Sequence, residues 1–194
     1  MPRPRLVLAS GSPRRRMLLA EAGIEFDVVS PDVDEKAEPG EAPEAMAMRL
    51  ASEKSLAVAQ RLGPEPERFA LGADTIVVVD DEVLGKPDDA SHAVALLGQI
   101  LGRQHDVITG FALTSSATLQ PVARAVTSTV TMRTADRAEI EAYVATGEPL
   151  DKAGAYGLQG EGRRFVTGVE GSETNVIGLP IDETRALLRR AGAE

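Results

Sequence analysis

Apolar and polar positions change their period several times along the chain, and each period predicts an element. The apolar run 6–9 predicts a short strand, and the alternation of apolar and polar residues over 126–132 predicts a strand buried on one face. Over 43–62, apolar residues recur at helical spacing, and Gly63 and Pro64 end this longest predicted helix. Strands interleaved with helices indicate an α/β or α+β fold.

The same patterns predict the other elements. The expected strands are 26–29, 69–73, 76–79, 107–115, 122–133 and 165–169. The other expected helices run from 13 to a stop at Gly23, from 90 to 101, from a cap at Asp136 to 145, and from 180 to 190. Asp80 and Asp81 are expected to form a turn, and strands 107–115 and 122–133 are expected to pair as a long hairpin.

The first predicted helix starts with positive charge, which helix electrostatics oppose. Ser12 is the expected N-cap and Pro13 the first helical residue, and Arg14–Arg16 follow at once. Because a helix N-terminus carries roughly +0.5 charge, arginines there are unfavourable unless an anion compensates them. Backbone N–H groups and guanidinium groups together bind phosphate or carboxylate. The cluster therefore predicts an anion site, and the alternative is a solvated basic turn.

Length and charge limit the classes of partner. The chain has 194 residues, and no segment in it resembles a flexible linker, so we expect one compact domain over 1–194. A formal net charge of −9 argues against broad adhesion to nucleic acid or to an anionic membrane surface. Any phosphate site must therefore be local. The absence of cysteine excludes disulfides, thiolate metal sites and a cysteine nucleophile.

Targeting segments and histidine chemistry are not indicated. The apolar run 6–9 is too short for the core of a signal peptide, and no stretch approaches the about 18 apolar residues of a membrane span. We therefore expect a cytoplasmic protein with no membrane partner. His92 and His105 are separated and are expected at the surface, so neither a histidine metal site nor a nucleophile triad is predicted.

Asp74 is the best single catalytic candidate. It comes just before the apolar strand 76–79, where a carboxylate would be held rigidly at the edge of the sheet. Such a group could bind Mg²⁺ or accept a proton from water, and Thr75 beside it could donate a hydrogen bond to a substrate. The alternative is an aspartate that caps a turn.

Other charged residues permit two interpretations each. Lys86, between a glycine and a proline, could clamp phosphate or could be a surface lysine. Lys54, on the long helix, could belong to a functional site or be an exposed partner of a nearby glutamate, and its spacing by itself favours the second interpretation. Asp32, Asp34 and Glu35 could share a metal ion, but acidic loops are usually just solvated.

The glycine-rich stretch 147–160 is predicted to be a binding loop. It has few residues that a core would demand, yet it carries Lys152, Tyr156 and Gln159. Glycines let the backbone approach a ligand, a lysine can meet phosphate, and a glutamine amide can pair with a donor and an acceptor on a base edge. The alternative is an ordinary long surface loop.

Five ordered motifs together resemble the Maf family of nucleoside triphosphate pyrophosphatases. They are Leu8–Leu19, Gly72–Thr75, Leu84–Pro87, Asp151–Gly160 and Asn175–Pro180. The resemblance implies a mixed α/β fold with an elongated, twisted sheet, flanking helices and two lobes around a cleft, similar to inosine triphosphate pyrophosphatases. It also implies a house-cleaning hydrolase of nucleotide metabolism, which converts a triphosphate to the monophosphate and pyrophosphate with a divalent cation, Mg²⁺ or Mn²⁺.

The resemblance also implies a role for each matching residue. Asp74 looks like the acceptor of a proton from water, and Glu35 joins it as a metal ligand. The implied phosphate-binding residues are Ser10, Arg15, Lys54, Lys86 and Lys152, with Arg14 also on the phosphate side. Arg16 is not required by the family pattern.

Three positions make the chain similar to the branch of the family that acts on dTTP and UTP, namely Arg14, Thr75 and Gln159. One departure is that no aromatic residue lies near Glu173, where that branch often has one. The implied partner is a nucleoside triphosphate, without nucleic acid, and a homodimer stays open. The alternatives are a nucleotide-binding regulator of cell division or septum formation, and a pyrophosphatase for other modified nucleotides such as 7-methyl-GTP.

Overall fold

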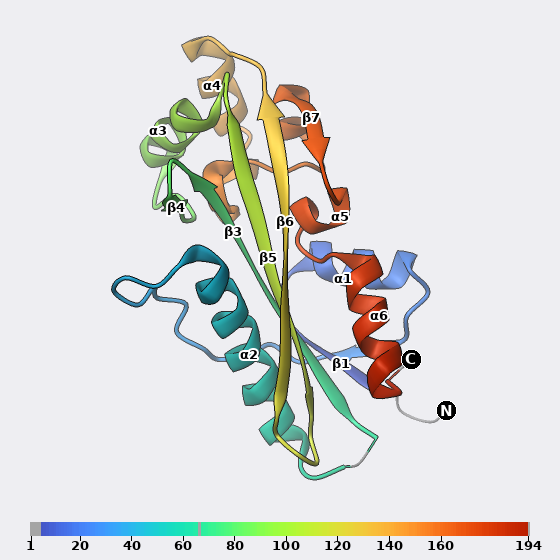
Figure 1. Ribbon diagram of the computed structural model, residues 1–194. Helices are drawn as coiled ribbons and strands as arrows, with labels where there is room; N and C mark the ends of the chain where they lie inside the picture. The colour runs from blue at the N-terminus through green and yellow to red at the C-terminus, as the bar shows by residue number, and fades with distance from the viewer. Residues whose placement is uncertain (1–4, 66, 194) are drawn as a thin grey trace. The chain divides into compact units, whose positions relative to one another are not determined.

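The computed structural model describes residues 5–65 and 67–193 and contains two compact units (Figure 1). Unit 1 holds the described residues up to Asp74 together with 109–126 and those from Gly178 onward. Unit 2 holds 75–108 and 127–177. The single domain over 1–194 and the cleft both stay predictions.

The described strands belong to one mixed sheet. They are β1 (Leu6–Ala9), β2 (Phe26–Val28), β3 (Phe69–Val79), β4 (Glu82–Leu84), β5 (Gln104–Ser115), β6 (Pro121–Met132) and β7 (Val166–Glu170). The strand order is β2-β1-β3-β5-β6-β7, with β4 paired to β3 outside this path. β1 pairs in parallel with β2 and β3, whereas β4 and β7 pair antiparallel to β3 and β6. This open sheet with its helices confirms the mixed α/β class.

The helices of unit 1 are α1 (Pro13–Glu21), α2 (Pro43–Leu62) and α6 (Ile181–Ala191). α1 begins as predicted, because the Ser12 side chain accepts a hydrogen bond from the Arg15 N–H and Pro13 occupies the first turn. In Figure 1, α2 lies on one side of the unit 1 strands and α1 and α6 lie together on the other. Arg185 of α6 donates to the carbonyl of Ala22 at the end of α1.

Two glycines let the backbone of α2 lie directly on the strands of unit 1. A Cβ at Gly72 of β3 would overlap the carbonyl oxygen of Ala51, and one at Gly110 of β5 would overlap that of Ala47. No side chain larger than hydrogen fits there without moving the helix. This close approach brings the middle of α2, with Lys54, over β3.

Unit 2 has its own hydrophobic core. Its helices are α3 (Ala90–Ile100), α4 (Arg137–Val144) and α5 (Glu173–Ile177), and its short 3₁₀ turns are η1 (Glu148–Asp151), η2 (Ala153–Ala155) and η3 (Glu161–Phe165). α3 and α4 lie together in Figure 1, and the core that they cover includes Leu97, Ile100, Tyr143 and Phe165. α4 begins with the predicted cap at Asp136.

One strand prediction was wrong. The chain over 69–79 forms a single strand, β3, and Asp74 lies inside it rather than ahead of a second strand. β1 pairs with residues 69–72 of β3 and β4 pairs with residues 77–79, so the ladder holds the backbone extended on both sides of the acidic residue. The turn at Asp80 and Asp81 is confirmed, and both residues have positive φ.

The expectation that His105 lies at the surface was also wrong. Its side chain is buried in unit 2, and its Nε2 lies 2.8 Å from the hydroxyl of Tyr156. Burial lowers the pKa of His105 to about 4, although the charge of Asp106 acts to raise it, so the imidazole is neutral at neutral pH. Tyr156 therefore belongs to the core, and the glycine-rich stretch carries more core residues than its composition indicates.

Two expectations concern targeting. Among the helices of residues 5–65 and 67–193, none is long and apolar enough to cross a membrane. The expected absence of a signal peptide involves residues 1–4, which lie outside the described residues. The cytoplasmic location stays a prediction.

Candidate functional site

A buried lysine joins two of the predicted acidic residues in unit 1. The Nζ of Lys54 lies 2.6 Å from Asp74 Oδ1 and 2.6 Å from Glu35 Oε1. The Lys54 side chain is only 5% exposed, so the exposed position that helix spacing favoured for this lysine was wrong. Lys54 is buried because α2 lies in close contact with β3 at Gly72, so the face of the helix that carries Lys54 points into the unit. The structure thus brings together three residues that the sequence spreads over 40 positions.

Glu35 reaches this cluster from the loop before α2. Arg49 of α2 fastens that loop, because its guanidinium donates to Glu41 at 2.7 Å and to the Lys36 carbonyl at 3.1 Å. Burial is not complete here, since the Glu35 side chain is 48% exposed. An anchored but accessible carboxylate can still meet a ligand from solvent.

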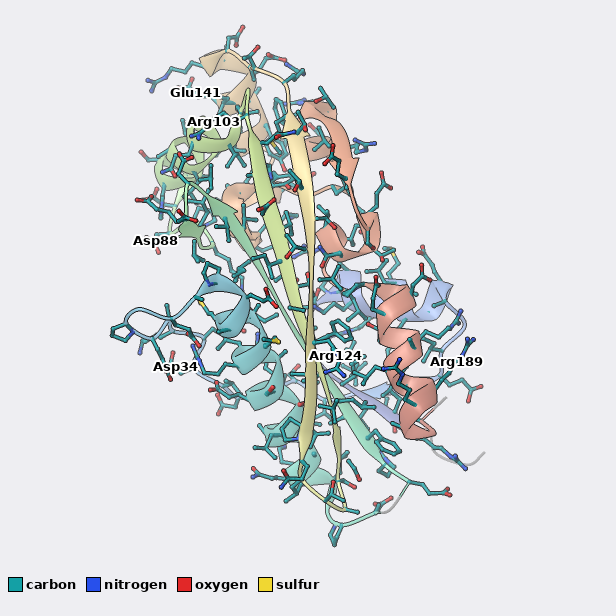
Figure 2. All side chains as sticks on the ribbon, viewed as in Figure 1. Asp34, Asp88, Arg103, Arg124, Glu141 and Arg189 are labelled. Atoms are coloured by element: carbon teal, nitrogen blue, oxygen red, sulfur yellow. The ribbon has the colours of Figure 1, made fainter. Side chains whose placement is uncertain are left out.

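The neighbouring acids do not join Lys54 through any contact described. Asp34 accepts from Lys36 at 2.9 Å and is 67% exposed, on the loop shown in Figure 2. Its hydrogen bond to Lys36 lowers the pKa of Asp34. Asp32 is exposed on the same loop. Of the three clustered acids, Glu35 is thus the one that the structure places beside Lys54.

Arg15 organises the start of α1. Its Nη1 donates to the Ser10 hydroxyl at 3.2 Å, and its Nε donates to the Gly178 carbonyl at 2.8 Å. The Ser12 N–H donates to the same Ser10 hydroxyl, so Ser10 joins the turn to the arginine. Arg15 and Ser10 therefore hold the turn at the N-terminus of the helix in one shape.

The charges of the two carboxylates act on Arg15. Desolvation lowers the pKa of Arg15, while Asp74 acts to raise it, Arg14 acts to lower it and Glu35 acts to raise it. An arginine stays protonated throughout the physiological range, so this side chain keeps its positive charge. The two cationic side chains, Lys54 and Arg15, therefore both have reduced access to water, and both interact electrostatically with the carboxylates of Asp74 and Glu35.

This arrangement suits an anion and a divalent cation. The N–H groups at the start of α1 and the Arg15 guanidinium can bind phosphate oxygens. Within the described residues, no group of three His, Asp or Glu side chains could hold a metal ion. Mg²⁺, however, is commonly bound by one or two carboxylates together with substrate phosphates. Glu35 and Asp74, which converge on one nitrogen, fit that requirement.

The candidate site residues that belong to unit 2 differ from one another in how exposed they are. Lys152 has a side chain 12% exposed, and its Nζ donates to Asp151 Oδ1 at 2.6 Å and to the Glu148 carbonyl. Lys86 is exposed after β4, whereas Thr75 and Gln159 are half-buried. Their roles toward a substrate stay predictions, as do those of the unit 1 residues.

Two residues with clear positioning contacts were not found from the sequence. Arg49 fastens the Glu35 loop, and Glu148 bonds several segments of the 147–162 stretch. Arg49 and Glu53 are spaced i, i+4, which signals only an ordinary helix pair. The one available signal for Glu148 was a carboxylate within a glycine-rich loop.

We expect Arg15→Lys to weaken the binding of inorganic triphosphate about 10-fold. A lysine keeps the charge but carries its donors on one nitrogen, so it does not reproduce the separate hydrogen bonds from Nη1 to Ser10 and from Nε to Gly178, and the turn loosens. Isothermal titration calorimetry measures the affinity. The matched control is Arg16→Lys, whose parent side chain is exposed and donates only to the Gly11 carbonyl among the bonds described, and it should bind as the unmodified protein does. Equal losses in both variants would contradict the special role of Arg15.

Comparisons with known proteins identify the family. The family model described as Maf-like protein matches residues 5–191. A dTTP/UTP pyrophosphatase of Geobacter metallireducens is 49% identical over 189 residues, which cover 97% of this chain and 97% of that protein. The dTTP/UTP pyrophosphatases of Myxococcus xanthus and Vibrio cholerae are 51% and 48% identical, and the alignments cover 96% of this chain and 92% and 97% of theirs. On this family match and these identities, the chain belongs to the Maf family.

Proposed function

We propose that the protein hydrolyses dTTP and UTP to the nucleoside monophosphate and pyrophosphate. Relatives about half identical over almost the full chain carry the name dTTP/UTP pyrophosphatase. The structural observation that carries the proposal is the buried Lys54 ammonium held between Asp74 and Glu35. A hydrolase of an acid anhydride needs a proton acceptor for water and positive charge for the leaving group, and this cluster supplies both.

In this mechanism the Asp74 carboxylate accepts a proton from the water that opens the bond between the α and β phosphates. Lys54 orients the carboxylate through its hydrogen bond to Oδ1. Pyrophosphate leaves, so negative charge builds up on the side of the β phosphate. We assign the binding of that charge to Ser10, Arg15, Lys54, Lys86 and Lys152.

Glu35 and Asp74 are the residues that would hold a divalent cation, Mg²⁺ or Mn²⁺. When bound, such an ion offsets the charge of the phosphate oxygens. The fit rests on two carboxylates that converge on one nitrogen, with Glu35 about half exposed. Arg49 contributes by holding the Glu35 loop against α2.

We assign the choice of the pyrimidine nucleotide to Arg14, Thr75 and Gln159. Gln159 is half-buried in the glycine-rich stretch, where its amide can offer both a donor and an acceptor to a base. Discrimination built on hydrogen bonds is strong, because a wrong base leaves polar groups of the site unpaired.

A substrate panel tests the proposal. Purified protein is supplied with dTTP, UTP, the other canonical triphosphates, ITP and 7-methyl-GTP, with Mg²⁺ or Mn²⁺, and phosphate is measured with and without added inorganic pyrophosphatase. We expect dTTP and UTP to be the fastest substrates, and phosphate to appear only when pyrophosphatase is present, since the product is pyrophosphate. Much faster turnover of ITP or 7-methyl-GTP would assign the protein to another substrate class.

A further inference from the structure

The carboxylate of Glu148 is a bonding centre within unit 2. Its Oε1 accepts from the Tyr143 hydroxyl at 2.9 Å and from the Gly162 N–H at 3.2 Å. Its Oε2 accepts from the Glu161 N–H at 2.9 Å. One carboxylate thus ties the end of α4 to the start of η3. The Glu148 carbonyl also accepts from Lys152 Nζ, so the same residue holds a third segment.

Tyr143 extends this network. Its ring is fully buried in the core of unit 2, and its hydroxyl accepts from the Gly157 N–H at 3.3 Å while it donates to Glu148. Burial raises the pKa of Tyr143, and so does the hydrogen bond to Glu148, which keeps the hydroxyl protonated as a donor. The backbone on both sides of Gln159 is therefore fixed, at 157 and at 161–162.

The loop has little space in which to rearrange. A Cβ at Gly162 would lie 2.5 Å from the Tyr143 hydroxyl, and one at Gly157 would lie 2.8 Å from Cε of Lys152. The stem of Lys152 thus packs against the backbone at 157, two residues before Gln159. A shift of the Glu148 carboxylate would therefore move the side chains of Gln159 and Lys152, because both residues belong to the loop that the hydrogen bonds of Glu148 hold together.

We infer that Glu148 is a positioning residue that sets Gln159 and Lys152 for the nucleotide, an inference that rests on the proposed function. Although burial acts to raise the pKa of Glu148, the hydrogen bonds from the Glu161 N–H and the Tyr143 hydroxyl hold that pKa below its ordinary value. The group stays ionised at neutral pH and offers two acceptor oxygens to three donors. It acts through the loop, and the substrate contacts belong to Gln159 and Lys152.

The test is Glu148→Gln. The glutamine amide keeps the shape of the carboxylate but replaces one acceptor oxygen by an NH₂ donor. In either orientation this NH₂ group faces another donor, either the Glu161 N–H or the pair formed by the Tyr143 hydroxyl and the Gly162 N–H, so at least one hydrogen bond is lost. We expect KM for dTTP and UTP to rise about 10-fold, kcat to change less than about 3-fold, and the preference for dTTP over ITP to fall. Tyr143→Phe removes one donor of three and should change KM and the preference in the same direction, by less.

The matched control is Glu161→Gln, in the same loop. It keeps the backbone N–H that bonds Glu148 and alters only a half-exposed side chain that faces Arg164, so kinetics should match those of the unmodified protein. A melting curve separates folding from positioning. Wild-type KM and base preference in Glu148→Gln, or a lower melting temperature as the sole change, would overturn the inference. If Glu148→Gln does not fold, Tyr143→Phe decides by the same criteria.

The two proposals fail in different ways. Failure of the proposed function is seen with the unmodified protein, as turnover of neither dTTP nor UTP. Failure of the Glu148 inference is seen as active protein whose KM and base preference do not respond to Glu148→Gln or Tyr143→Phe.

Discussion

Asp74→Asn is expected to lower kcat for dTTP by about 10²–10⁴-fold, the range that a general base contributes. An asparagine has almost the same shape as the aspartate but does not accept a proton from water. The side chain lies inside β3 and is nearly buried, so the backbone ladder should persist. Lys54 keeps Glu35 as a partner, which limits the loss in stability to less than the about 3–5 kcal/mol of a fully broken buried pair. A coupled pyrophosphate assay measures kcat.

Binding should survive this change. The affinity for a non-hydrolysable dTTP analogue, measured by calorimetry, is expected to change less than about 10-fold, because Arg15 and the start of α1 are intact. Asp34→Asn is the matched control, since Asp34 is an exposed acid one residue from Glu35 and should leave kcat unchanged. Near-wild-type turnover in Asp74→Asn would refute the general-base assignment. A pure regulator of septum formation, by contrast, could lose Asp74 and keep its cellular role.

Lys54→Met is expected to reduce kcat/KM by at least about 10²-fold. Methionine keeps the buried stem but removes the ammonium that lies 2.6 Å from both carboxylates. Positive charge in a site with little water stabilises developing charge most strongly. Asp74 also loses its bonded cation, so the free energy of unfolding in urea should fall by up to about 3–5 kcal/mol.

A second readout of Lys54→Met does not depend on turnover. Without the ammonium, the two carboxylates lose a competing positive charge, so nucleotide-free protein should bind Mn²⁺ about 10-fold more tightly. Electron paramagnetic resonance of free Mn²⁺ measures this, and bound Mn²⁺ should restore part of the lost stability. The control is Lys36→Met, an exposed lysine paired with Asp34. Unchanged Mn²⁺ affinity in Lys54→Met would show that Glu35 and Asp74 are not the metal ligands.

Local sequence signals predicted most of the elements well. The strand 6–9, the Ser12 cap, the helix 43–62 and the cap at Asp136 all match the structure. Each depends on a period, a cap or a breaker within a few residues, so the information lies in neighbouring positions. The single strand over 69–79 escaped the pattern, because pairing with β1 and β4 outweighed the polar residue in its middle.

For the candidate site, the sequence indicated which residues are involved but not the surroundings in which they lie. Their identities came from ordered motifs that the chain shares with one family, and the match over 5–191 agrees with that resemblance. Their surroundings did not follow from spacing. Spacing alone favoured an exposed position for Lys54 and a surface position for His105, and both residues are buried.

The sequence by itself therefore determined the order of strands and helices, the arginine-rich helix start and the membership of the Maf family. Tertiary structure alone decided that Lys54 reaches Asp74 and Glu35, and that Glu148 ties together the loop around Gln159. The reason is physical. Periods, caps and turns arise from neighbouring residues, whereas burial and charge pairing depend on which backbones can approach, as α2 approaches β3 at Gly72.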